Sequence, residues 1–180
     1  IVRALLLLSQ ADAGRLPLTR TRLDLSRELA ALREDIEALA TGTQLRLEFT
    51  IPEGVWIEAD AILLRQALLN LLVNAVHYTE PGGHVGVTLV SRTGGIDLDI
   101  SNSGPGVAPE DQRRLFDRFF RADTARNRHT GGSGLGLSLS REIARAHEGD
   151  LILVESRPGH TCFRLSLPNR LADPGHSPVG

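Results

Sequence analysis

The sequence predicts an α+β two-layer sandwich, in which a mixed β-sheet is covered on one face by about three helices and preceded by a short helical segment. Three observations lead to this prediction. The chain has 180 residues, enough for one domain with a substantial core. Apolar residues make up 41% and charged residues 23%, as in ordinary globular domains. Helical segments and β-hairpins follow one another without the strict strand–helix alternation of a parallel α/β fold.

Charge and cysteine content exclude several classes of protein. The net charge is −2 and the isoelectric point about 6.3, which disfavours nucleic acid or an anionic membrane as a partner. The single cysteine, Cys162, rules out an internal disulfide, so we expect a small core residue in a reducing compartment. No apolar run approaches the roughly 20 residues that span a bilayer. Because the chain starts on Ile1 without methionine, we expect a piece of a longer protein.

The N-terminal part of the chain predicts two helices. Residues 1–13 are typical of the end of an apolar helix that Gly14 terminates, and residues 15–25 of a linker. A second helix is expected over residues 26–40, because apolar residues recur there every three or four positions. This stripe consists of Leu25, Leu29, Leu32, Ile36 and Leu39.

The rest of the chain alternates strand and helix patterns. Polar and apolar residues alternate in two stretches that predict strands, and a helix capped by Asp60 follows over residues 61–78. Two hairpins and two further helices complete the domain, which we place at residues 26–168, with a disordered tail at 169–180. The expected strands are at residues 44–52, 54–59, 84–92, 96–102, 150–156 and 161–168, and the further helices at 109–120 and 136–147.

Four polar residues share one face of the predicted helix 61–78. They are Gln66, Asn70, Asn74 and His77, spaced 4, 4 and 3 residues apart. A solvated face usually carries Glu, Lys or Arg rather than carboxamides, which have poorer helix propensity. A carboxamide oxygen is a good ligand for Mg²⁺, which takes few protein ligands beside phosphates and water. The spacing alone leaves a solvated face and a magnesium site equally open.

A glycine-rich turn follows the predicted strand that ends at Asn102. Gly104 and Gly106 permit close approach of the backbone, and Pro105 between them stiffens the turn. A polar side chain at the end of a strand beside such a turn can hydrogen-bond a nucleotide base. Taken alone, the pattern favours an ordinary tight turn over a base-binding site.

A second run of glycines leads into the predicted helix 136–147. Gly132, Gly134 and Gly136 alternate, and the exposed N–H groups and positive end of the helix suit a phosphate. The pattern is weak by itself. It is not a Walker loop, because no Gly-Lys-Ser/Thr sequence follows, and it is not a dinucleotide-binding fingerprint, because no strand immediately precedes it.

Together, and in this order, the three sites resemble the motifs of bacterial sensor histidine kinases. NLLVNAVHYT is similar to their N box, NSGPGV to the first glycine box, and GGSGLGLSLSREIARAHEGD to the second. LFDRFFRAD, with three of the five phenylalanines of the chain, resembles their F box. The resemblance runs from about Gln44 to Pro168, and residues 1–13 resemble the end of the second dimerisation helix. It implies a Bergerat-type ATP-binding fold, shared with DNA gyrase, ninety-kilodalton heat-shock chaperones and mismatch-repair ATPases.

The resemblance implies a site for ATP and Mg²⁺. Asn74 would hold the metal, with Asn70 assisting near the phosphates as a catalytic residue. Arg121, the second catalytic residue, would reach the γ-phosphate, with Arg118 assisting, and residues 103–130 would form a mobile lid. The nucleotide-binding residues would be Asn70, Asn74, His77, Tyr78, Asn102, Gly104, Gly106, Arg118, Arg121, Gly132, Ser133, Gly134, Leu135 and Gly136.

The chain departs from the family pattern at a few positions. Asn102 stands where the family has an Asp that accepts from the adenine amino group; its amide oxygen can still accept, but without the charge. Because kinases resembling heavy-metal sensors also carry Asn there, we do not interpret it as inactivating. His77 replaces a Lys, and Glu148 replaces the first Gly of a His-Gly-Gly ending. We interpret His147 as a helix C-terminal residue favoured by the helix dipole.

The resemblance further implies that this domain donates the γ-phosphate of ATP to a histidine on a dimerisation domain that the chain lacks. A response-regulator aspartate would then take the phosphate. We therefore expect the isolated chain not to phosphorylate itself, and to be a monomer or weak dimer, whereas the full-length parent would be a homodimer. The chain would be the cytoplasmic domain of an inner-membrane protein.

Two alternatives remain open. An ATPase clamp of the gyrase or chaperone kind needs a catalytic Glu on the N-box helix, where this chain has Gln66 and Asn70 on the comparable stripe. A degenerate nucleotide-binding signalling module is the other, with Asn102 and His77 as the residues that suggest it.

Overall fold

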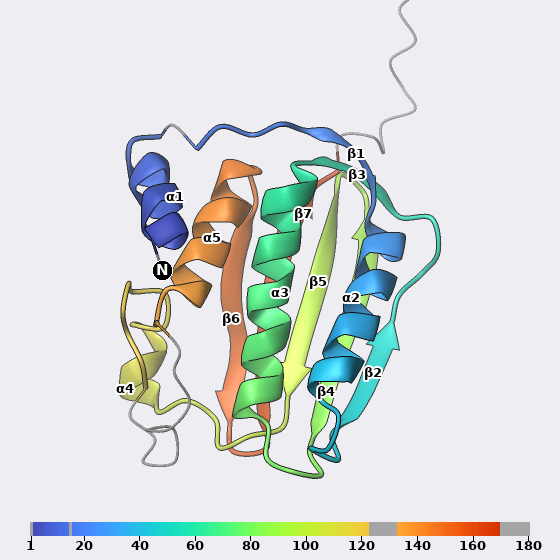
Figure 1. Ribbon diagram of the computed structural model, residues 1–180, viewed down its shortest axis with the longest axis vertical. Helices are drawn as coiled ribbons and strands as arrows, with labels where there is room; N and C mark the ends of the chain where they lie inside the picture. The colour runs from blue at the N-terminus through green and yellow to red at the C-terminus, as the bar shows by residue number, and fades with distance from the viewer. Residues whose placement is uncertain (1, 15, 123–132, 170–180) are drawn as a thin grey trace, which may run out of the picture.

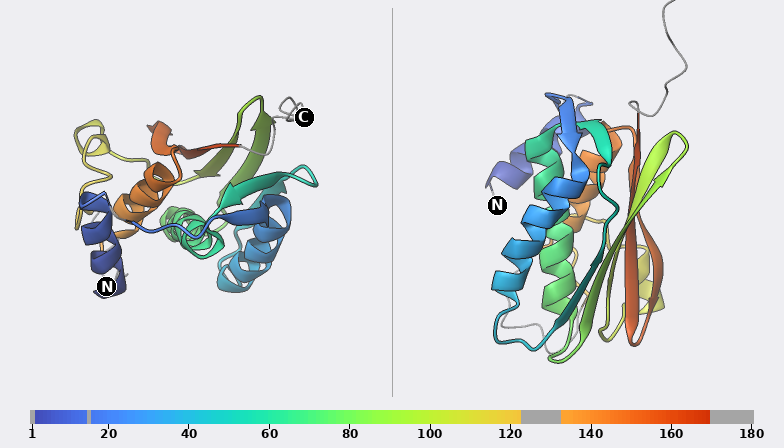
Figure 2. Two further views of the ribbon diagram at one scale, coloured as in Figure 1. Left: turned by 90° about the horizontal axis from the view of Figure 1, so that it is seen from above. Right: turned by 90° about the vertical axis from the view of Figure 1, so that its right-hand side faces the viewer.

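The structure, a computed structural model, describes residues 2–14, 16–122 and 133–169. It has two layers, a mixed sheet and the helices that cover one of its faces (Figures 1 and 2), so the predicted α+β sandwich is confirmed. The helices are α1 Val2–Asp12, α2 Leu25–Leu39, α3 Ala61–Tyr78, α4 Pro109–Gln112 and α5 Gly136–Ala146. The strands are β1 Thr21–Asp24, β2 Arg46–Thr50, β3 Trp56–Ala59, β4 His84–Arg92, β5 Gly95–Asn102, β6 Asp150–Arg157 and β7 His160–Pro168.

The main sheet has the strand order β2-β4-β5-β7-β6. β2 and β4 pair in parallel, and the other neighbours are antiparallel. Alternation along β5 explains the two faces of the sheet, since Ile96, Leu98 and Ile100 are buried on the face that the helices cover. On the other face Asp99 accepts two hydrogen bonds from Arg164, at 2.6 and 2.7 Å. One face therefore supplies the core and the other is polar.

The central helix is α3, and its bounds are those that the sequence predicts. The carboxylate of Asp60 caps it by accepting from the N–H groups of Ile62 and Leu63, at 3.1 and 3.0 Å. By length and composition alone this helix could cross a membrane. Its apolar face is instead packed into the core over the sheet, which accounts for its hydropathy. The buried residues are Leu63, Leu64, Ala67, Leu68, Leu71, Leu72 and Ala75.

The predicted apolar stripe of α2 is wrong at its last position. Leu39 is 52% exposed, whereas Ala40, the C-cap residue, is buried. At 3.6 residues per turn, the residue four positions after the buried Ile36 lies on the inner face of the helix as readily as the residue three positions after it. The short side chain of Ala40 takes the inner position, and Leu39 points to solvent.

The predicted linker contains a strand. β1 pairs antiparallel with β3, with Thr21 opposite Ala59 and Asp24 opposite Trp56. Asp24 then caps α2 by accepting from the N–H of Arg27 at 3.0 Å. The small sheet fixes where α2 starts, so this segment positions a helix and does not act as a free connection.

The helix α1 lies against α5 and forms a second, smaller core with it and with α3 (Figure 1). Leu8 is 1% exposed in this cluster. Gly14, with φ +63°, ends the helix as the sequence predicts. The other buried members are Leu63, Ala67, Leu135, Leu139 and Ile143.

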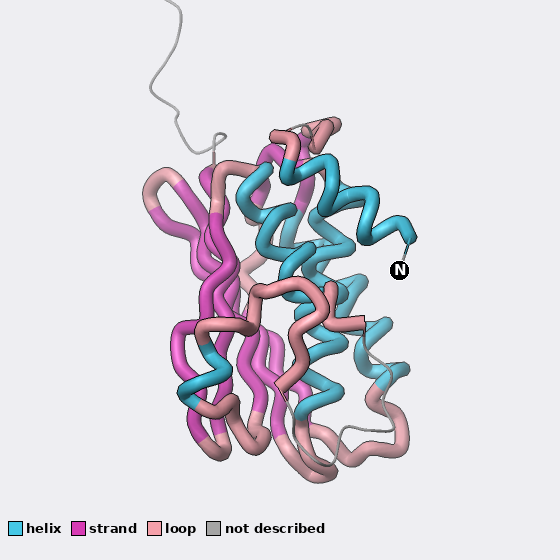
Figure 3. Tube along the Cα trace, turned by 90° about the vertical axis from the view of Figure 1, so that its left-hand side faces the viewer, coloured by secondary structure: helices cyan, strands magenta, loops and turns pink. Residues whose placement is uncertain are grey.

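The predicted helix at residues 109–120 is only partly present. It begins at Pro109 but ends at Gln112, and turns follow as far as Phe119. Phe119 has φ +61°, which is incompatible with a right-handed helix, and its N–H donates to the carbonyl of Gly134 at 2.9 Å. A long-range hydrogen bond thus replaces the helical one. Figure 3 shows α4 beside the sheet and the loop after it reaching toward the helices.

Candidate functional site

A cavity of about 600 Å³ opens between α3, the end of β5, and the loops on either side of the undescribed residues 123–132. Its size lies within the usual range for small-molecule sites. It is lined by Leu69, Asn70, Val73, Asn74, His77, Tyr78, Asn102, Pro105, Gly106, Val107, Leu115, Phe120, Arg121, Ala122, Ser133, Gly134, Gly136, Leu137, Thr161 and Phe163. The three segments that the sequence singles out therefore meet at one cavity.

The helix α3 supplies one wall. Asn70, Asn74 and His77 line the cavity from one face, as their spacing predicts, whereas Gln66, one turn earlier, does not line it. The amide nitrogen of Asn70 donates weakly to the carbonyl of Gly136, at 3.4 Å. This contact orients the side chain so that its amide oxygen is the atom left to meet a cation. The wall therefore offers two carboxamides.

Tyr78 and two aliphatic side chains make part of this wall apolar. The rings of His77 and Tyr78 meet edge to face, with their centroids 5.1 Å apart. Leu69 and Val73 also line the cavity, and they are 37% and 39% exposed. Exposed aliphatic side chains beside polar groups suit a ligand with an apolar part and a charged part.

Asn102 is a buried residue of the cavity lining. It is 5% exposed at the end of β5, where its neighbour on β7 is Thr161. Thr161 also lines the cavity, and its hydroxyl lies 2.9 Å from that of Ser156. Thr161 belongs to none of the motifs that the sequence predicts. Alternation along β7 points to it, because Thr161, Phe163 and Leu165 are alternate residues on the buried face of the strand and Thr161 is the polar one.

The first glycine turn is shaped by contacts within the protein. A Cβ on Gly104 would lie 2.3 Å from the carbonyl oxygen of Tyr78, and one on Gly106, where φ is +76°, would lie 2.7 Å from the backbone of Arg157. Larger residues are therefore excluded at both positions. Gly106 lines the cavity but Gly104 does not. The turn fits between the end of α3 and the β6–β7 hairpin, and holds the end of β5 in place.

The second glycine turn contains two glycines with different roles. Gly134 has φ +68°, and a Cβ there would lie 2.7 Å from the backbone of Phe119. Gly136 begins α5, and the nearest atoms to a Cβ there, on Asn70, are at an ordinary 3.8 Å. Packing therefore requires glycine at 134 but not at 136. Contacts within the protein therefore do not explain the glycine at 136. A ligand that closely approaches the backbone there would explain it.

The N-terminus of α5 faces the cavity through Gly136 and Leu137. The N-cap residue Leu135 has no side-chain oxygen and makes no capping bond, so the first N–H groups of this helix suit an anion. Ser133 also lines the cavity, but Leu135 is buried in the α1 cluster instead. Gly132 lies outside the described residues.

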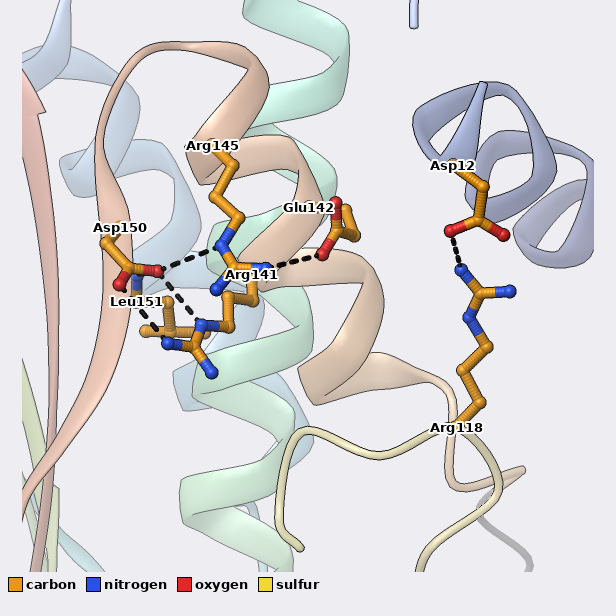
Figure 4. A network of polar contacts seen from close by, with 7 residues as sticks. All are labelled: Asp12, Arg118, Arg141, Glu142, Arg145, Asp150 and Leu151. Atoms are coloured by element: carbon orange, nitrogen blue, oxygen red, sulfur yellow. Dashed lines mark hydrogen bonds and ion pairs between the residues drawn. The ribbon is translucent and has the colours of Figure 1, made fainter. Parts of the chain in front are cut away.

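The two predicted arginines are placed differently. Arg121 lines the cavity, whereas Arg118 does not and forms a hydrogen-bonded ion pair with Asp12 of α1 (Figure 4). Arg118 lines instead a second crevice, of about 370 Å³, which shares Phe120 and Arg121 with the cavity. Because its guanidinium group is held by a carboxylate, the structure does not place it at the cavity. The crevice is lined by Asp111, Arg114, Arg118, Phe119, Phe120 and Arg121.

His147 is the C-cap residue of α5, as the sequence predicts, but its ring is neutral, so the helix dipole does not account for it. Its side chain is 2% exposed, and its Nε2 accepts from the N–H of Asp60 at 2.9 Å. Its Nδ1 lies 2.8 Å from the carbonyl oxygen of Ile143, so Nδ1 carries the proton and the ring is neutral. Burial lowers the pKa of His147. This residue ties the end of α5 to the start of α3.

Glu148 adopts a conformation that favours glycine. Its φ is +65°, in the left-handed region, which is consistent with the glycine that the family motif carries at this position. Its carboxylate accepts from Arg20 at 2.9 Å. At the next position, a Cβ on Gly149 would lie only 1.9 Å from the carbonyl of Ser166, so glycine is required there.

The fold and the cavity define a class of protein. A two-layer sandwich places a carboxamide-bearing helix and two glycine turns around one cavity, and the sequence matches the family of histidine kinase-, DNA gyrase B- and HSP90-like ATPases over residues 59–171. The chain belongs to this family.

Within the family, the chain is a catalytic ATP-binding domain of the sensor histidine kinase type. It is 36% identical to sensor histidine kinase CusS of Escherichia coli O157:H7 over 94% of this chain and 35% of that protein. The structure of the mycobacterial sensor histidine kinase MprB is 30% identical, with a TM-score of 0.73 over 83% of this chain and 99% of that one. Full-length ShkA in complex with AMPPNP is 26% identical, with a TM-score of 0.79 over 93% of this chain and 35% of that one. The chain thus spans about a third of the length of CusS.

Proposed function

We propose that this domain binds Mg-ATP in the cavity and donates the γ-phosphate to a histidine on a dimerisation domain outside this chain. A response-regulator aspartate then receives the phosphate. The observation that carries the proposal is the convergence of Asn74, Asn102 and Gly136, from three separate segments, on one cavity of about 600 Å³. The likeness to ShkA, whose structure holds an ATP analogue, supports the same ligand.

The residues divide the cavity into a base end and a phosphate end. Asn102 and Thr161, both buried, offer an amide and a hydroxyl to an adenine ring, and Tyr78 offers an apolar surface. The start of α5 at Gly136 offers N–H groups and a positive helix end to phosphates. Arg121 lines the same cavity and would neutralise charge on the γ-phosphate.

Magnesium would be held by amide oxygens. Among the described residues no group of three or more His, Cys, Asp or Glu side chains could hold a metal ion. A site of Asn74 and Asn70 suits Mg²⁺, because this ion keeps several waters and takes phosphate oxygens as its other ligands. When bound, the ion would neutralise phosphate charge. The side chains of the cavity would position the nucleotide and shield it from water.

The parent protein would be a homodimeric inner-membrane kinase of which this chain is a cytoplasmic part. The likeness to CusS, a sensor histidine kinase of which the match covers 35%, supports a longer parent protein of the same kind. Its partners would be its own dimerisation domain and a response regulator. Nothing in the charge of the chain, −2 overall, favours nucleic acid.

Calorimetric titration with a non-hydrolysable ATP analogue, with and without Mg²⁺, tests the proposal. We expect Mg²⁺ to strengthen binding to the wild type and Asn74→Ala to remove that gain, weakening binding in Mg²⁺ by at least about tenfold. Asn169→Ala is the matched control, because Asn169 follows β7, donates its backbone N–H to the carbonyl of Gly94 and does not line the cavity. No binding by the wild type near about 1 mM ligand would favour the degenerate module instead.

A further inference from the structure

The described lining of the cavity contains no carboxylate. Its side chains include no Asp or Glu, and Arg121 is the one that carries a permanent charge. The other polar side chains of this lining are carboxamides, hydroxyls and an imidazole, and each of these groups can both donate and accept a hydrogen bond. They belong to Asn70, Asn74, His77, Tyr78, Asn102, Ser133 and Thr161. The uncharged part of a ligand therefore meets groups of either hydrogen-bonding polarity.

Asn102 is the most deeply buried of these polar side chains in the described lining. It is 5% exposed, and within the described part of the chain its amide has no hydrogen-bond partner. Every fully buried polar side-chain atom of the described residues does have a partner. The unpartnered amide is therefore open to the cavity, where a ligand can supply the missing hydrogen bonds.

The hydroxyl of Thr161 lies beside this amide and can also reverse its polarity. Thr161 is directly opposite Asn102 in the pairing of β5 with β7, so both side chains are on one face of the sheet. Its hydroxyl lies 2.9 Å from that of Ser156, and either of the two can be the donor. Ser156 also accepts from the N–H of Val107 at 2.9 Å, which leaves its own proton free to point either way.

The amide of Asn102 has room to turn. A Cβ on Gly104 would lie 3.1 Å from its nitrogen, so the glycine leaves space beside the amide. With its oxygen toward the base, the amide accepts from the exocyclic amino group of adenine. After a half-turn, its nitrogen donates to the oxo group that hypoxanthine and guanine carry at the same ring position. A carboxylate can make only the first of these contacts, because it has no proton to donate.

We propose that Asn102 allows this site to take purine nucleotides with either an amino or an oxo group at that ring position, so that ATP is one of several phosphate donors. This inference rests on the proposed function and extends its class of substrate. Asn102 selects for a purine by its place at the base, and does not select between the two kinds of purine. The phosphate contacts at the start of α5 are the same for both.

Calorimetric titration with the Mg²⁺ complexes of ADP and inosine diphosphate tests the inference. Inosine diphosphate is the probe because it carries the oxo group without the additional amino group of guanine. We expect the wild type to bind the two ligands within about threefold of each other. Asn102→Asp should bind ADP at least about tenfold more tightly than inosine diphosphate, because a buried carboxylate facing an oxo group is left unpaired. Measurement at about pH 7.5 keeps that carboxyl ionised.

Two further variants complete the experiment. Asn169→Asp, outside the cavity lining, introduces the same charge and should keep the wild-type ratio of affinities. Asn102→Ala should weaken both ligands alike, because it removes the contact with either base. Thermal unfolding checks that each variant is folded.

Two results would overturn this inference and leave the proposed function standing. One is a wild type that prefers ADP at least about tenfold, and the other is a folded Asn102→Asp protein with the wild-type ratio. If the wild type bound neither ligand, the proposed function would fail, and this inference with it.

Discussion

At the residue scale, the sequence determines which polar groups can be buried. His147 is buried as a neutral ring because each of its nitrogens has a backbone partner, on Asp60 and on Ile143. Asn102 is buried at the cavity without a charge to desolvate. Asn102 departs from the family pattern, which has Asp at this position, whereas His147 matches it.

Stability should fall as the pH falls through the range in which histidine ordinarily titrates. Burial depresses the pKa of His147 in the folded state, so the unfolded chain binds a proton first and folding loses stability on acidification. The loss has a limiting slope of about 1.4 kcal/mol per pH unit. Urea unfolding between about pH 7.5 and 5.5 should show a steeper decline in the wild type than in His147→Gln. Equal declines in the two proteins would contradict the neutral, buried histidine.

Asn102→Asp should strengthen nucleotide binding and lower the stability of the nucleotide-free domain. A carboxylate accepts a hydrogen bond more strongly than a neutral amide, which corresponds here to about three- to tenfold in affinity for adenine nucleotides. The same carboxylate, at a position 5% exposed, is costly to bury when no ligand is present. Calorimetry and thermal unfolding measure the two effects. Unchanged or weaker binding would show that Asn102 does not accept from the base.

At the element scale, the chain predicts its helices better than its loops. Asp60 and a continuous apolar pattern define α3 to the residue, and alternation defines the β4–β5 hairpin. The loop after α4 could not be predicted, because its conformation depends on a hydrogen bond from Phe119 to Gly134, which lies far along the chain. β1 was missed for a similar reason, since its partner β3 lies beyond α2. The local sequence of a segment predicts poorly which distant segment it pairs with.

The two glycines of the second turn should respond differently to alanine. Gly134→Ala should lower the free energy of unfolding by about 1–3 kcal/mol, because the position needs a positive φ and has no room for a methyl group. Gly136→Ala should leave stability unchanged, or raise it by up to about 1 kcal/mol, because alanine favours a helix. Its effect should be on nucleotide affinity, weakened at least about tenfold. If a folded Gly136→Ala protein bound the nucleotide with wild-type affinity, the phosphates would not bind at this turn.

At the scale of the whole molecule, the cavity is a product of topology. α3, the end of β5 and the start of α5 are separated in sequence, and the sheet order β2-β4-β5-β7-β6 brings them together. The motifs predicted Asn70, Asn74 and Asn102 as neighbours of one ligand. They did not predict that Arg118 would pair with Asp12, because that contact depends on where α1 docks. Charge and motif identify candidates, and packing decides which of them line the cavity.

The isolated chain should bind ATP without phosphorylating itself. Residues 1–13, the part of the chain that resembles a dimerisation helix, contain no histidine, and the acceptor would come from the parent's own dimerisation domain. Incubation with γ-labelled ATP should leave the chain unlabelled. The same domain added to a protein that carries the dimerisation helices should label that partner. Stable incorporation into the isolated chain would contradict the division of roles.

The central claim is that one cavity, built from a carboxamide helix, the end of β5 and two glycine turns, holds a single magnesium-bound triphosphate. A crystal structure of the domain grown with Mg²⁺ and a non-hydrolysable ATP analogue tests it most directly. We expect adenine beside Asn102 and Thr161, the metal on the amide oxygen of Asn74, and phosphates at the start of α5. Nucleotide bound elsewhere, or a metal that does not contact Asn74, would contradict it.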